Sequence, residues 1–248
     1  MGRTGNVGVG RPWIVVLALV ALLAPAIAWA QDLTVVSTVT ANGRQVQKTD
    51  YIGATATRTG MGDGSEIILR LDQKKMYLLR PAQKTYSEMT FDELQAMAAK
   101  ATAAIEKLPP EAAEQMKKMM GAMGAGEVAV THVGPGEPVA GYATERYHVV
   151  LGTMMEGDIW AAPELTLPPM FYDAMKAATP VNPILDMKKL FDEYKKVKGM
   201  PLKTVTQSKM MGQSMTSTTL ATSVDRKPIP PSTFEVPAGF KLVPMAAK

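Results

Sequence analysis

The chain has 248 residues, with 27 lysines and arginines against 23 aspartates and glutamates, two histidines and no cysteine. Without cysteine there can be no disulfides and no thiolate chemistry. Lysines and acids are interleaved on the same segments, which argues against a basic stripe that binds nucleic acid. The length is ample for one domain with a sizeable core.

The N-terminus has the pattern of an export signal. Arg3 and Arg11 give the start of the chain a positive charge, and an apolar run, WIVVLALVALLA, follows at 13–24. A triplet AWA at 28–30 then supplies the small residues of a cleavage site. Pro25 interrupts the run, which is too short for a membrane-spanning helix. We therefore expect cleavage before Gln31 and no membrane span in the mature chain. Removing the two arginines leaves 25 basic against 23 acidic side chains, a net charge of +2.

The first part of the mature chain, residues 33–89, reads as strands joined by tight turns. Apolar and polar side chains alternate at 33–40, and Asn42-Gly43 is the pair typical of a two-residue hairpin. Further strands are expected at 54–58, 67–71, 76–79 and 85–89, with turns at 60–64, 72–75 and 81–84 between them. Such short connections predict an antiparallel meander, because parallel strands need long crossovers.

The hydrophobic period changes to that of a helix at Thr90. Thr90 and Glu93 fit a capping box, and apolar residues then recur at helical spacing until Pro109-Pro110. A second helix is expected from Glu111 to the glycines at 121–126. A third and a fourth are expected over 169–178 and from Asn182 to Gly199.

The remaining segments read as strands again. They are 127–133, 142–151, 155–165, 202–211, 213–224 and 234–243. The order of strands, two helices, strands, two helices and strands predicts an α+β domain, in which helices pack on one face of a single antiparallel sheet. No internal repeat or low-complexity linker divides the chain, so residues 31–248 are expected to form one domain.

No set of residues in the sequence predicts catalysis. His132 and His148 both fall on expected strands and are offset across the hairpin between them, so both are interpreted as structural. The glycine-rich segment 60–64 joins two strands and opens no helix, which argues against a phosphate loop. The segment around Asp63 lacks the other oxygen-bearing side chains, at the required spacing, that a calcium-binding loop needs. The sequence therefore predicts no enzyme activity, no cofactor and no metal site of this kind.

Nineteen methionines are the unusual feature of the composition. Met116, Met119, Met120 and Met123 recur on one side of the second expected helix. This spacing fits an apolar core, an adaptable surface for apolar ligands, or soft thioether ligands for copper(I). The residues alone leave these three interpretations open.

One stretch, IILRLDQKKMYLLRPAQKTYSEMTFDEL at 67–94, resembles a family of exported bacterial proteins of unknown function related to the lipoprotein carrier LolA and the lipid-binding LppX. GYATERYHV at 141–149, GDIWAAPEL at 157–165 and FEVPAGFK at 234–241 extend the resemblance. It implies a strongly curved, half-open antiparallel barrel with helices on its apolar concave face. In such carriers the cavity takes acyl chains or lipids, and an arginine on an early strand latches the lid. Position assigns that latch to Arg58.

We therefore expect a monomeric, non-enzymatic periplasmic protein that binds a lipid or a lipoprotein acyl chain between sheet and helices. The residues expected to line the site are Ile67, Leu69, Met76, Leu78, Met116, Met119, Met120, Met123, Trp160, Phe171, Met175 and Phe191. The first alternative is a structural or interaction protein with a closed core, whose partners are other envelope proteins. The second is a methionine-rich copper(I) binder.

Overall fold

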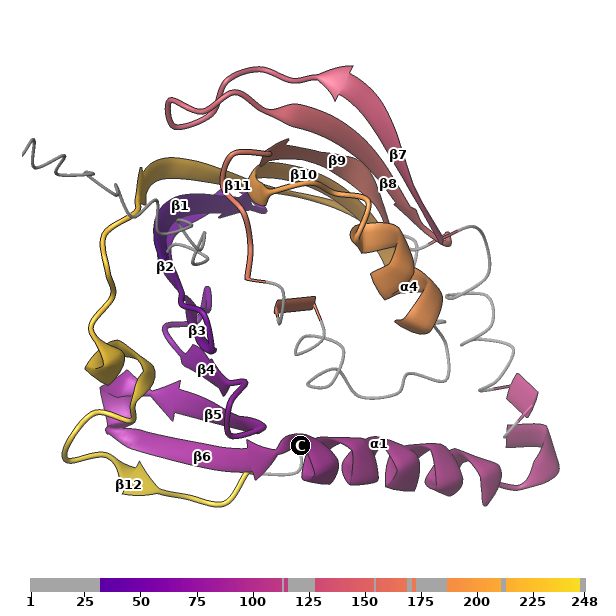
Figure 1. Cartoon of the computed structure of the whole chain (residues 1–248). Coiled ribbons are helices and arrows are strands. Elements are labelled where there is room, and N and C mark those ends of the chain that lie inside the picture. The colour runs from indigo at the N-terminus through magenta and orange to yellow at the C-terminus, as the bar shows by residue number, and fades with distance from the viewer. Residues whose placement is uncertain are drawn as a thin grey trace, which may run out of the picture.

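A computed structural model describes residues 32–112, 114–115, 128–153, 155–168, 171–172, 187–210 and 213–245. Within them, twelve strands form one sheet in the order β12-β6-β5-β4-β3-β2-β1-β11-β10-β9-β8-β7 (Figure 1). Every neighbouring pair is antiparallel except β12 and β6. The sheet does not close on itself in the part of the chain that the structure describes. The prediction of a single, mostly antiparallel sheet is confirmed.

The N-terminal half of the sheet is the predicted meander. It contains β1 (Leu33–Ala41), β2 (Arg44–Ile52), β3 (Ala56–Gly60), β4 (Glu66–Arg70), β5 (Lys75–Arg80), the 3-10 turn η1 (Pro81–Gln83) and β6 (Thr85–Thr90). Asn42 and Gly43 have φ values of 51° and 72°, the left-handed backbone that a two-residue hairpin requires. The Asn-Gly signal therefore predicted this hairpin correctly.

Helix α1 (Phe91–Glu106) follows β6 directly, and the predicted capping box is present. The Thr90 backbone N–H donates to Glu93 Oε2 at 2.7 Å, and the Glu93 N–H donates to Thr90 Oγ1 at 3.1 Å. Leu94 packs beside Phe91, whereas Met97 is 49% exposed. Figure 1 shows α1 extending away from the end of β6. The start of α1 thus contributes to the core.

The C-terminal half contains β7 (Val128–Pro135), β8 (Glu145–Leu151), β9 (Met155–Ala162), helix α4 (Met187–Tyr194), β10 (Met200–Met210) and β11 (Gln213–Asp225). The predicted offset of the two histidines is confirmed, because His148 pairs with Thr131 and His132 pairs with Tyr147. β11 pairs with β1 along most of its length, and this pairing joins the two halves into one sheet.

The strand predicted at 234–243 is wrong for most of its length. The chain there forms a 3-10 turn η2 (Pro231–Phe234) and a two-residue strand β12 (Lys241–Leu242). Pro228, Pro230 and Pro231 lead into the segment and Pro237 lies within it. Because proline has no N–H to donate, these residues prevent a continuous ladder.

The two faces of the sheet can be followed from the strand registers. One face, here called the inner face, carries Val35, Leu69 and Ile159, and the other, the outer face, carries Ile68 and Trp160. Figure 1 shows the sheet curving so that α4 lies on its inner side and η2 on its outer side. In the described part of the chain, no helix is both long and apolar enough to cross a membrane.

Candidate functional site

Helix α4 places an apolar stripe against the inner face of the C-terminal half. Leu190, Phe191, Tyr194 and Val197 recur at the spacing of one helix side. Tyr194 and Val197 pack on a buried cluster formed by Val130, Tyr147, Val149, Ile159 and Ala161. The apolar residues of α4 are therefore the reason that the helix docks on β7, β8 and β9.

Polar contacts fix the position of α4 on the sheet. The Val130 N–H donates to Glu193 Oε2 at 2.8 Å, and the Lys198 N–H donates to the Tyr147 hydroxyl at 3.3 Å. Since β7 is the last strand of the sheet, Glu193 satisfies an edge N–H that has no neighbouring strand. The hydrogen bonds from Lys196 and from the Val130 N–H lower the pKa of Glu193, so the carboxylate is charged at neutral pH.

An apolar cavity of about 410 Å³ lies between α4, the segment after β9 and the ends of the neighbouring strands. Its lining is Leu151, Leu167, Phe171, Tyr172, Leu190, Phe191, Tyr194, Val197, Met200 and Pro201. No charged side chain is among these residues. Burial raises the pKa of Tyr172 and of Tyr194, so both phenols are neutral at physiological pH. The volume falls in the range of pockets that bind small molecules.

The lining residues predicted on the N-terminal half form a separate apolar surface. Ile67 pairs with Leu78 and Leu69 pairs with Met76, so all four side chains lie on the inner face. Leu69 and Met76 pack against the buried pair Leu71 and Phe91. These residues share a face with the cavity but do not line it.

The other predicted residues are divided between the cavity and other places. Phe171 and Phe191 line the cavity, whereas Trp160 lies on the outer face, one residue out of phase with Ile159. The predicted Met116, Met119, Met120, Met123 and Met175 lie outside the described residues. The ligand-binding role of the whole set stays a prediction.

Eight of the ten cavity residues were not predicted from the sequence. Leu190, Tyr194 and Val197 could have been found with Phe191, because all four fall on one side of the fourth expected helix. Leu151, Met200 and Pro201 lie at strand ends, and Leu167 and Tyr172 lie in a connection. Their meeting depends on the tertiary fold, and no local pattern indicates it.

Arg58 contacts the C-terminal segment on the outer face. Its Nε donates to Glu66 Oε2 at 2.8 Å, and its Nη1 donates to the Thr233 carbonyl oxygen at 3.0 Å. Arg58 and Glu66 also line a polar groove of about 430 Å³ beside β2 and β3. These partners lie on the face opposite to α4, and the proposed role of Arg58 as a lid latch stays a prediction.

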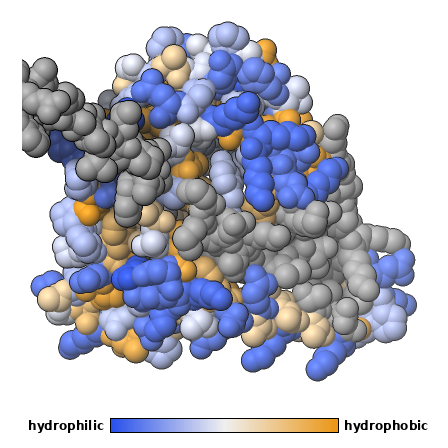
Figure 2. Space-filling model, viewed as in Figure 1, coloured by the Kyte–Doolittle hydropathy of each residue, from blue (hydrophilic) through white to orange (hydrophobic). Residues whose placement is uncertain are grey.

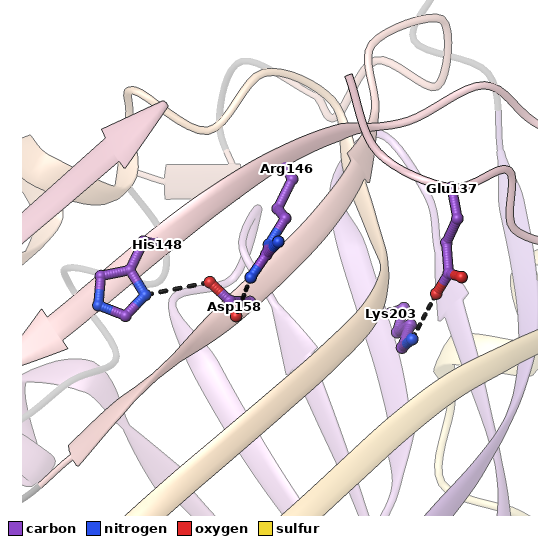
Figure 3. A network of polar contacts seen from close by, with 5 residues as sticks. All are labelled: Glu137, Arg146, His148, Asp158 and Lys203. Atoms are coloured by element: carbon purple, nitrogen blue, oxygen red, sulfur yellow. Dashed lines mark hydrogen bonds and ion pairs between the residues drawn. The ribbon is translucent and has the colours of Figure 1, made fainter. Parts of the chain in front are cut away.

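A polar network occupies the outer face of β8, β9 and β10 (Figure 3). Arg146 Nη2 donates to Asp158 Oδ2 at 2.8 Å, and His148 Nδ1 lies 3.0 Å from Asp158 Oδ1. Lys203 forms an ion pair with Glu137, and its Nζ lies 4.4 Å from the centre of the Trp160 ring. Trp160 therefore contacts these cations and a buried apolar cluster that includes Val139, and it does not line the cavity under α4.

Burial alone would raise the pKa of Asp158, but the hydrogen bonds from Arg146 and His148 outweigh it and lower that pKa. The network therefore consists of compensated ion pairs. In the described ranges no three His, Cys, Asp or Glu side chains converge as they would to hold a metal ion. The geometry of this network supports a structural role for His148 and Asp158.

Comparison with known protein families gives the class of this chain. The model of the family described as a domain of unknown function (DUF4412) matches residues 35–240. The chain belongs to this family, and the predicted membership of a family of unknown function is confirmed. A comparison with curated proteins finds no match.

Several solved structures are similar to the chain at low identity. MucB aligns with a TM-score of 0.37 and 13% identity over 87% of this chain and 60% of MucB. The Pseudomonas aeruginosa MucA/MucB complex gives a TM-score of 0.37 and 11% identity over 87% of this chain and 59% of the other. A LolA superfamily protein from Nitrosomonas europaea gives 0.29 and 6% over 84% and 91%. The chain thus spans about three fifths of MucB, and TM-scores of this size carry no conclusion about its ligand or partner.

Proposed function

We propose that this protein is a non-enzymatic periplasmic protein that binds a hydrophobic ligand, a lipid or a lipoprotein acyl chain, on the inner face of its sheet. The observation that carries the proposal is the cavity of about 410 Å³ under α4, whose lining contains no charged side chain. This cavity is open to solvent on one side, so its apolar lining is exposed to water unless a ligand covers it. A cavity of this size with an apolar lining fits a ligand better than a solvent-filled space.

The proposed architecture around the ligand is a half-open barrel with helices over its concave face. Its support is the curvature of the sheet and the position of α4 on the inner side (Figure 1). Figure 2 shows hydrophobic residues gathered in the hollow beside the N-terminal strands, with hydrophilic residues around its rim. Ile67, Leu69, Met76 and Leu78 belong to this inner face, and we propose that they bind further parts of a long ligand.

The proposed compartment is the periplasm, reached by the export signal in the first thirty residues. The support is the sequence pattern of a charged start, a short apolar run and a small-residue triplet. N-terminal sequencing of the exported protein should give Gln31 as its first residue. Recovery of Met1 on membrane-bound protein would contradict both the cleavage and a carrier that acts in solution.

A native mass spectrum of the exported protein tests the proposal most directly, because a co-purified lipid appears as added mass. In parallel, a fluorescent fatty-acid probe should bind the delipidated protein, and Leu190→Trp should weaken that binding at least tenfold. Leu190 lines the cavity, so the larger ring occupies space that the ligand needs. The melting temperature should change little, since the added atoms fill a void.

The matched control is Leu220→Trp, the same change at a side chain that is 40% exposed on the outer face of β11. It should leave probe binding unchanged. If α4 instead completed a closed core, Leu190→Trp would overpack it at a cost of about 1–3 kcal/mol, and the parent protein would bind no probe. That result would favour an envelope structural or interaction protein.

A further inference from the structure

We propose that the exposed lysines of α4 and the turn after it dock the rim of the cavity on a membrane surface that carries anionic phospholipids. This inference rests on the proposed function, because it explains how an apolar ligand enters and leaves the cavity. It names the surface on which the exchange takes place. Three observations carry it: the charge of the segment, the direction of its acidic side chains and its position beside the cavity.

The segment 187–198 contains five lysines and two acidic residues. Lys189, Lys195, Lys196 and Lys198 are all exposed. Such a concentration of positive charge contrasts with the net charge of the mature chain, which is only +2. Clusters of lysine on an amphipathic helix are typical of segments that bind anionic lipid headgroups.

The two acidic side chains of the segment compensate only part of this charge, and five lysines against two acids leave a net charge of +3. Glu193 is turned toward the sheet, where its carboxylate accepts the hydrogen bond from the Val130 N–H, and its side chain is only 17% exposed. It also pairs with Lys196 at 2.7 Å. Asp192 is the one exposed acid on α4 and its following turn. From the sequence alone, lysines and acids here read as a balanced surface, whereas in the structure one of the two acids, Glu193, is turned toward the sheet.

The lysines are adjacent in the chain to residues that line the cavity. Lys189 and Lys195 directly flank Leu190 and Tyr194, which line the cavity, and Lys198 follows the lining residue Val197. Helix α4 thus places apolar side chains on the cavity, and the exposed lysines lie beside them, at Lys189 on the helix and at Lys195, Lys196 and Lys198 in the turn after it. Figure 2 shows a hydrophilic patch over the position that α4 has in Figure 1. If this side lies on the headgroups, an acyl chain can pass between membrane and cavity with little exposure to water.

The test is flotation of the exported protein with vesicles of phosphatidylcholine alone and of phosphatidylcholine mixed with phosphatidylglycerol. The protein should bind only the anionic vesicles, and high salt should weaken the binding because it screens exposed charges. Lys195→Gln with Lys198→Gln should reduce binding by about 25-fold, at about fivefold for each charge near the surface. The matched control is Lys100→Gln with Lys107→Gln, which removes two exposed lysines at α1 and should leave binding unchanged.

The failure of this inference differs from the failure of the proposed function. The α4 double variant should still bind the fatty-acid probe in solution, because neither lysine lines the cavity. No binding to anionic vesicles, equal binding to neutral ones, or an equal loss in the α1 control would overturn the docking surface while probe binding keeps the ligand cavity. Absence of probe binding by the parent protein would instead remove the proposed function, and with it the reason for the docking.

Discussion

The two halves of the sheet are covered on opposite faces. In the N-terminal half, the outer face is covered by the C-terminal segment, where Phe234 packs against Ala56, Ile68 and Leu79. In the C-terminal half, the inner face is covered by α4, and its outer face carries ion pairs. One continuous sheet therefore has two different covers, each made from a different part of the chain.

The two covers differ in how tightly they pack. A Cβ placed on Gly53 would lie 3.1 Å from the Phe234 ring, so this ring packs closely on the sheet. Under α4, by contrast, a cavity of about 410 Å³ remains. If the proposed ligand site is correct, a side chain removed under α4 should cost less stability than one removed under the C-terminal segment, because it already borders empty space.

A phenylalanine-to-alanine change in each half tests this difference with the largest expected effect. Phe234→Ala should destabilise the fold by about 3–5 kcal/mol, because it empties a close-packed core, while the remaining folded protein still binds the probe. Phe191→Ala should destabilise it by only about 1 kcal/mol, since one side of this ring already faces a cavity, yet weaken probe binding. Denaturant unfolding and probe titration measure both. Similar stability losses in the two variants would contradict the division into a packed and a ligand-binding half.

A second test of this comparison changes the connection between α4 and β10. Gly199 has a φ of +88°, and a Cβ there would lie 1.9 Å from the Ala162 carbonyl oxygen. Gly199→Ala therefore combines an unfavourable backbone with a backbone clash, and we expect a loss of about 2–4 kcal/mol together with weaker probe binding. Gly239→Ala is the control, because φ is +83° there and the Cβ meets nothing within 4 Å. It should cost about 1 kcal/mol, and equal losses at both sites would show that the clash does not matter.

Local signals in the sequence predicted the local structure well. The Asn42-Gly43 turn and the Thr90/Glu93 capping box formed as expected, because each depends only on residues a few positions apart. The alternation of apolar residues also predicted the strands of both halves. It could not predict that β1 pairs with β11, since alternation marks a face and not a partner strand.

The candidate site was less predictable because it depends on which face each side chain occupies. A shift of one residue along a strand moves a side chain to the other face. Trp160 was predicted to line the site, but Ile159 and Ala161 are the residues of β9 that face α4. Phe191, which was predicted to bind the ligand, lines the cavity, and the helical period around it also contained Leu190 and Tyr194. The sequence indicated an apolar helix face there, and only the fold shows the space beneath it.

The outer faces of the two halves give the smallest predicted effect. The N-terminal half holds its outer cover mainly by apolar packing, whereas Asp158 holds Arg146 by an ion pair and His148 by a hydrogen bond. Because the pKa of Asp158 is lower in the folded protein than its ordinary value of about 3.9, the ionised carboxylate stabilises the fold at pH values above that ordinary value. This contribution is lost as the pH falls through the lowered pKa.

Asp158→Asn should therefore lower stability by about 0.5–1 kcal/mol at pH 7, and melting curves of variant and parent should converge as the pH falls below about 4. Ser87→Ala, a change on the inner face of the N-terminal half, should show no such convergence. If the difference in melting temperature between Asp158→Asn and the parent stays constant down to the lowest pH, the network stabilises the fold by packing and not by the charge of Asp158.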